Sequence, residues 1–253
     1  MDLKKRLTRF VWVNMRRFSF RSLLTILALV GVLGAAGCAY QPTETVDQNP
    51  VSRKFTWFSY LDGKGIRSNC LPNSPFRMRA VYNGVYDEQI RTYDLRPRVG
   101  EPGAFDLSVR VISEADLSEV EVKKIGGLLN PWRGTGEKII LQQSDIALLD
   151  RTLEADGIFA KPPVGLELHS DEFYWILSVC KEGGAYFNAV KWPNESFKKA
   201  QFPKLLEGWD MTGIPFNPPR QVLNFDNPLR RSEEFRTDFR LRIGENGLWG
   251  ILQ

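Results

Sequence analysis

The stretch FRMRAVYN at Phe76–Asn83 decides the fold class, because its apolar and charged residues alternate. Successive side chains of a β-strand point to opposite faces. One face of this stretch is therefore predicted to carry Phe76, Met78, Ala80 and Tyr82. Asn83 is followed by Gly84, a pair that is typical of two-residue hairpin turns. We predict a hairpin whose return strand spans Tyr86–Leu95.

Several other stretches are rich in β-forming residues. Phe105–Ile112 alternates in the same way, and Lys138–Gln142 is a short apolar run. Lys54–Leu61, KFTWFSYL, is dense in aromatic residues and is predicted to be the first strand of the domain. Turn residues separate further pairs of strand-like runs, which predicts two more hairpins: Phe173–Lys181 with Ala185–Trp192, and Phe235–Ile243 with Leu248–Leu252.

Helical spacing is clearest after Ser144, which is predicted to be an N-cap. Ile146, Leu149 and Leu153 then recur on one helical face, and Gly157 is predicted to end the helix.

The pattern as a whole predicts an α+β fold, mainly an antiparallel sheet or sandwich with three hairpins and one or two short helices. We expect one β-rich globular domain over residues 53–253. Ser196–Leu206 is predicted to hold a short helix interrupted by Pro203, and Ser113–Lys124 fits either a helix or a strand. The helix and hairpin from Ser144 to Trp192 resemble a pattern in uncharacterised bacterial envelope proteins. That resemblance implies a fold and no activity.

An apolar stretch, LLTILALVGVLGAAGC at Leu23–Cys38, follows Arg16, Arg17 and Arg21. It is shorter than the about 20 residues that a membrane-spanning helix needs. Its basic start, apolar middle and small-residue end are typical of a signal peptide. Ala35-Ala36-Gly37-Cys38 resembles the lipobox of bacterial lipoproteins, with Ala35 in place of the usual leucine.

The lipoprotein resemblance implies that residues 1–37 are a signal peptide and that Cys38 is lipidated. Residues 38–52 then form a polar tether that holds the domain at a membrane. Ala39 follows the cysteine where aspartate would favour inner-membrane retention, so we expect the outer membrane, facing the periplasm, with the inner membrane left open. An uncleaved membrane helix or a plain secretory signal are the alternatives. Met15, ahead of the arginine pair, is an alternative start to Met1.

The basic charge of the chain lies largely in the predicted signal. The first 37 residues hold seven of the 34 basic residues and one of the 30 acidic residues, so the remainder carries 27 basic and 29 acidic residues. Such a balance argues against nucleic acid as a partner. Of the three cysteines, lipidation would use Cys38. In an oxidising compartment we then predict a disulfide between Cys70 and Cys180, with two buried thiols as the alternative.

The residues that carry chemistry form no recognised catalytic or metal site, and we predict neither a cofactor nor a metal. His169 is the sole histidine, and its neighbours Ser170 and Asp171 are adjacent on the chain, whereas a triad converges in space. Scattered acids leave open a carboxylate hydrolase: Asp94, Asp106, Glu167, Asp171 and Glu172.

Two sets of residues suggest a binding role. The aromatic set either lines a ligand groove or fills the core: Trp57, Tyr60, Tyr174, Trp175 and Tyr186. The basic set either forms a face for anionic envelope polymers or lies on ordinary solvated strand faces: Arg77, Arg79, Arg91, Arg96, Arg98 and Arg110. We therefore expect a non-catalytic, lipid-anchored envelope protein that binds or scaffolds an envelope protein or polymer. A carrier of a small ligand or lipid is the alternative, and an envelope hydrolase ranks third.

Overall fold

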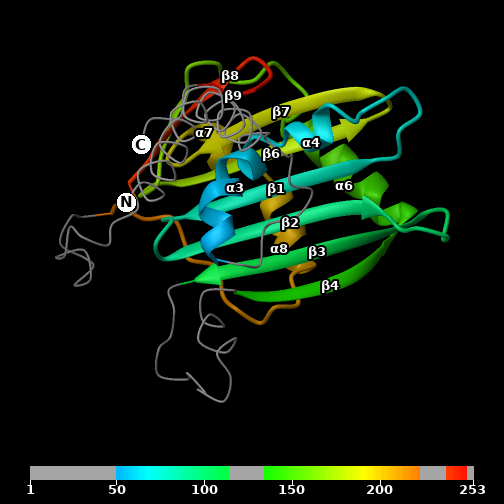
Figure 1. The fold of residues 1–253 in the computed structure, drawn as a ribbon, viewed down its shortest axis with the longest axis horizontal. Helices are drawn as coiled ribbons and strands as arrows, with labels where there is room; N and C mark the ends of the chain where they lie inside the picture. Colours follow the sequence, from blue (N-terminus) through cyan, green and yellow to red (C-terminus); the bar gives the residue numbers. More distant parts are fainter. Residues whose placement is uncertain (1–49, 114–133, 223–237, 250–253) are drawn as a thin grey trace, which may run out of the picture. The chain divides into compact units, whose positions relative to one another are not determined.

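Strand β1 (Arg77–Gly84), the strand predicted from FRMRAVYN, lies inside a six-stranded sheet between β2 and β6 (Figure 1). The computed structural model describes residues 50–113, 134–222 and 238–249. The strand order is β4-β3-β2-β1-β6-β7, and all neighbours are antiparallel. A smaller sheet has the order β5-β8-β9. The predicted α+β, mainly antiparallel fold class is confirmed.

The bounds of the described elements are as follows. The strands after β1 are β2 (Gln89–Pro97), β3 (Ala104–Ser113), β4 (Thr135–Gln142), β5 (Glu167–His169), β6 (Phe173–Lys181), β7 (Gly184–Lys191), β8 (Arg240–Gly244) and β9 (Gly247–Leu248). The helices are α3 (Pro50–Asp62), α4 (Lys64–Arg67), α6 (Gln143–Ala155), α7 (Glu195–Lys199) and α8 (Phe202–Gly208).

The first two predicted hairpins form, but the first has a different turn. Asn83 and Gly84 remain in β1, and the chain turns afterwards, at Val85, which has a φ of 63°. The Asn83 amide is used elsewhere, because its Nδ2 donates to the carbonyls of Ser170 at 3.0 Å and Glu172 at 2.6 Å. The β6–β7 hairpin turns at Glu182-Gly183, and Gly184 is the first residue of β7.

The prediction of a strand at KFTWFSYL is wrong, because this stretch lies in helix α3. Trp57, Tyr60 and Leu61 are spaced i, i+3 and i+4, which places them on one helical face, and all three are buried. Burying that face against the sheet outweighs the β-propensity of the aromatic residues. Helix α3 begins at Pro50, so the predicted tether to Ser52 overlaps the helix by three residues.

The six-stranded sheet is buried on both faces. On one face, helices α6 and α8 cover a core that includes Met78, Tyr93 and Trp175. On the other face, α3 and the small sheet cover a core that includes Val81 and Ile176. Figure 1 shows α3 in front of β1 and β2, with α8 behind the sheet. This two-sided burial explains why β1 is buried at seven of its eight positions.

The remaining elements refine the predicted boundaries. Helix α6 carries the predicted face, but its N-cap is Gln142 rather than Ser144, and the side chain of Asp145 accepts from the Gln142 amide at 2.8 Å. The predicted helix at Ser196–Leu206 is two helices, α7 and α8, and Pro203 lies at the start of α8, where proline is tolerated.

The third hairpin is β8–β9, and residues 235–237 and 250–252 of that prediction lie outside the described residues, as do Cys38 and most of Ser113–Lys124. Within the described ranges no helix is both long and apolar enough to cross a membrane.

Candidate functional site

The β8–β9 hairpin is fixed against the end of α3 and against α4. The Leu248 amide donates to Asp62 Oδ1 at 2.7 Å, and Arg67 donates to the Asn246 carbonyl. Arg67 also forms an ion pair with Asp62 at 3.0 Å. A Cβ at Gly247, where φ is 132°, would lie 2.3 Å from the Asp62 carboxylate, so this close approach requires glycine.

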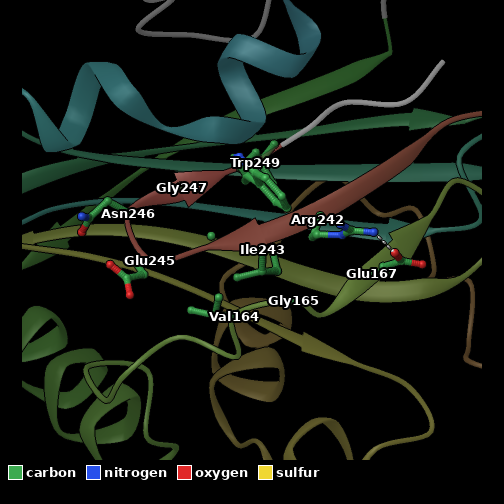
Figure 2. Close-up of a pocket in the computed structure, with 11 residues that line it drawn as sticks. Val164, Gly165, Glu167, Arg242, Ile243, Glu245, Asn246, Gly247 and Trp249 are labelled. Atoms are coloured by element: carbon green, nitrogen blue, oxygen red, sulfur yellow. Dashed lines mark hydrogen bonds and ion pairs between the residues drawn. The ribbon is translucent and has the colours of Figure 1, made fainter.

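A groove of about 670 Å³ lies between this hairpin and the segment at Val164–Gly165 (Figure 2). It is also lined by Glu167, Arg242 and Trp249. Trp249 is 65% exposed, and the Arg242 guanidinium carbon lies 5.4 Å from the centre of its ring. The groove thus combines a large exposed aromatic surface with polar groups, a combination that is typical of small-molecule binding sites.

A short chain of contacts orients the exposed tryptophan. The Trp249 amide donates to the Arg242 carbonyl at 2.8 Å, and the Arg242 side chain forms an ion pair with Glu167 across β5 and β8 (Figure 2). The hydrogen bond from Arg242 lowers the pKa of the Glu167 carboxyl, so this acid is ionised at neutral pH. Arg242 is therefore held between a carboxylate and an indole ring.

Glu245 and Asn246 form the turn between β8 and β9 and also line the groove. Both are exposed. Within the described part of the chain, the two side chains make no hydrogen bond or ion pair. They supply a carboxylate acceptor and an amide that can both donate and accept.

A second hollow of about 540 Å³ lies at the β2–β3 loop, with Arg96, Arg98, Asp106 and Lys138 among its lining residues. Its charges are largely compensated. Arg98 lies 2.9 Å from both Glu101 and Asp106, and Lys138 lies 3.9 Å from Asp106. The hollow is therefore a less promising binding site than the groove.

The predicted aromatic groove residues do not gather around one cavity. Trp57, Tyr60 and Tyr174 lie in the core under α3, and Trp175 lies in the core on the opposite face of the sheet. All four are no more than 3% exposed. Tyr186 is partly buried against that opposite core. Four of these residues thus fill the two cores, the alternative left open by the sequence.

Two of the residues predicted to form one basic face, Arg79 and Arg91, lie on opposite faces of the sheet. Arg79 is buried under α3, where its Nε donates to Asp94 at 2.8 Å and its Nη1 donates to the Tyr60 carbonyl at 2.9 Å. Tyr60 donates to the same carboxylate at 2.6 Å. Burial and the neighbouring Asp94 raise the pKa of Tyr60 well above its usual value, so Tyr60 remains a donor.

Arg91 lies on the opposite face, where it is fully buried and binds Asp210. Tyr93 donates to the same carboxylate at 2.9 Å. Burial alone would raise the pKa of Asp210, but hydrogen bonds from Thr212 and Tyr93 and the charge of Arg91 lower it. Because these two arginines are buried and paired on opposite faces, neither alternative left open by the sequence, a shared basic face or solvated strand faces, holds for them.

Three of the five candidate carboxylates lie in different parts of the structure. Asp94 lies under α3, Asp106 lines the second hollow, and Glu167 lines the groove. In the described ranges no group of three His, Cys, Asp or Glu residues is arranged to hold a metal ion.

The structure contains the predicted disulfide between Cys70 and Cys180. It joins the segment after α4 to the end of β6, across a sequence separation of 110 residues.

The Gly244–Gly247 turn lies between two runs that the sequence predicts as strands, but the groove beside it was not predicted. One signal was present, because strand alternation places Leu248 inward and Trp249 outward. The positions of Glu167 and Arg242 gave no comparable signal, since the two partners are separated by 75 residues in the sequence.

The described residues form a sheet-rich α+β domain with an open groove beside the β8–β9 hairpin, and they define the class of protein no further. Comparisons of the chain with protein-family models, curated proteins and solved structures found no match.

Proposed function

We propose that this chain is a lipid-anchored protein of the bacterial envelope whose folded domain binds another envelope component without catalysis. The observation that carries the proposal is the Cys70–Cys180 disulfide. It uses two of the three cysteines and leaves Cys38, at the end of the lipobox-like stretch, available for a lipid. Disulfides persist in oxidising compartments, and the periplasm is one of them.

The binding role is supported by the distribution of the polar groups. Two ion pairs, Arg79–Asp94 and Arg91–Asp210, have buried side chains. These side chains bind each other or segments that cover the sheet. The groove residues Glu245, Asn246 and Trp249, in contrast, are exposed to solvent. The groove is therefore better suited to a ligand than the second hollow.

Intact-protein mass spectrometry tests the anchor on full-length protein expressed in a bacterium and purified from membranes. We expect the mass of Cys38–Gln253 plus a diacylglyceryl group and an amide-linked acyl chain. Reduction should add about 2 Da, because opening one disulfide takes up two hydrogens. A matched Cys38→Ser variant should remain uncleaved and unmodified. An unmodified full-length mass for the original sequence would contradict the proposal.

A further inference from the structure

We propose that the groove beside the β8–β9 hairpin binds a neutral saccharide, with one sugar ring lying against the exposed part of Trp249. This inference rests on the binding role proposed above and names its ligand class. It does not depend on the lipid anchor. Three features of the groove carry it: a preoriented aromatic surface, unpaired polar groups beside it, and a charge that disfavours anions.

Trp249 presents a flat apolar surface that is already held in place. Its backbone amide is bonded to β8, and Arg242, itself bound by Glu167, lies against its ring. A side chain that is oriented before the ligand arrives loses less conformational entropy on binding. The apolar C–H face of a sugar ring can pack on such an indole while the sugar hydroxyls remain free for hydrogen bonds.

The polar groups suited to those hydroxyls lie in the turn next to the tryptophan. Glu245 and Asn246 line the same groove, and within the described residues their side chains have no partners. A carboxylate accepts from hydroxyl groups, and a carboxamide both donates and accepts. A sugar can therefore satisfy both side chains without displacing a hydrogen bond that the described structure already makes.

The charge of the groove favours a neutral ligand over an acidic one. Glu167 and Arg242 compensate each other, and Glu245 leaves an unpaired negative charge. An acidic glycan or a phosphate group would meet repulsion from this carboxylate. A lipid chain is also disfavoured, because Glu245, Asn246 and Arg242 would lose water against an acyl chain.

A peptide that adds a strand to the small sheet is a poorer fit. The edge strand β9 has two residues, and the amide of Leu248 is already bonded to Asp62. A long ladder of main-chain hydrogen bonds, the usual source of affinity in strand addition, is not available at this strand.

Isothermal titration calorimetry of the full chain in detergent tests the inference. The probes are chitotetraose, cellotetraose and maltotetraose as neutral saccharides, with tetragalacturonate as the acidic one. We expect at least one neutral tetrasaccharide to bind and tetragalacturonate to bind more weakly. The variant Trp249→Ala should weaken binding by at least about tenfold, because it removes the stacking surface.

The matched control is Met211→Ala, which truncates another residue that is 64% exposed but lies outside the groove. It should bind like the original chain. Thermal unfolding verifies that each variant is folded, and Asn246→Ala serves as a second groove variant with reduced binding expected. The inference is overturned if none of the neutral probes binds, if tetragalacturonate binds more tightly, or if the groove variants bind as well as Met211→Ala. Such a result leaves the Cys38 mass measurement unaffected, so the two proposals fail separately.

Discussion

The two faces of the six-stranded sheet are covered by segments that are attached in different ways. On one face, α3 is held by the buried Arg79–Asp94–Tyr60 network, and the Cys70–Cys180 disulfide ties the segment after α4 to β6. On the other face, residues 210–220, here called the strap, have no disulfide within the described residues. Both faces use a buried arginine–aspartate pair, and the α3 face adds a covalent bond.

The strap is held by side chains of β1 and β2. Arg91 binds Asp210 and the Ile214 carbonyl, and it lies 3.9 Å from the Phe216 ring centre. Tyr82 donates to the Asn217 carbonyl at 2.6 Å. Because no disulfide holds the strap, loss of the Asp210 charge should loosen the strap before the α3 face, whereas a reductant should act on the α3 face.

The largest effect is expected from removing the disulfide. In the chain-entropy model, a closed loop of this length stabilises by on the order of 4–5 kcal/mol, and the sequence separation of Cys70 and Cys180 is 110 residues. The double substitution Cys70→Ala/Cys180→Ala should lower the free energy of unfolding by up to about that amount, measured by urea denaturation. Hydrogen exchange should increase most in α3 and α4. An equal increase in the strap would contradict the distinction between the faces.

Removing the arginine under the strap should have the next largest effect. The variant Arg91→Met leaves the buried Asp210 carboxylate without its cation, which is expected to cost about 3–5 kcal/mol. Hydrogen exchange should now increase first in residues 210–220 and leave α3 protected. The matched control is Arg151→Met, at an exposed position of α6, which should change stability by no more than about 0.5 kcal/mol. Faster exchange in α3 than in the strap would refute this assignment.

The sequence predicted the strands better than the segments that cover them. Alternation located β1, β2, β3, β6 and β7 to within a few residues, because a strand imposes a period of two. The aromatic residues of Lys54–Leu61 led to the wrong prediction of a strand. Such residues fit a helical face equally well, and tertiary burial decided the outcome.

Buried charge was harder to foresee than fold class. Arg79 and Arg91 look like solvated strand residues in the sequence, since nothing near them in the chain marks Asp94 or Asp210 as a partner. Arg91 and Asp210 are separated by 119 residues and meet only because the strap folds back over β2. The disulfide was predictable because the choice of cysteines was small, whereas the groove depends on side chains that converge from separate strands.

The smallest effect is expected from protonating Asp210. The pKa of Asp210 is lower in the folded protein than its ordinary value, so its contribution to stability is present above about pH 4, the unfolded-state pKa, and is lost as the pH falls further. Asp210→Asn should destabilise the protein at neutral pH, and its difference from the original chain in urea unfolding should shrink below about pH 4. Glu207→Gln, which removes an exposed charge on α8, should change stability by no more than about 0.5 kcal/mol at neutral pH.

Pepsin, which works in acid, can locate the loosened segment. If Asp210 holds the strap, acid should expose residues 210–220 to cleavage before α3, since the disulfide on the α3 face does not titrate. Cleavage that begins in α3 would mean that the covalent bond contributes less to that face than the carboxylate does to the other. The distinction between a reductant-sensitive face and an acid-sensitive face would then have to be abandoned.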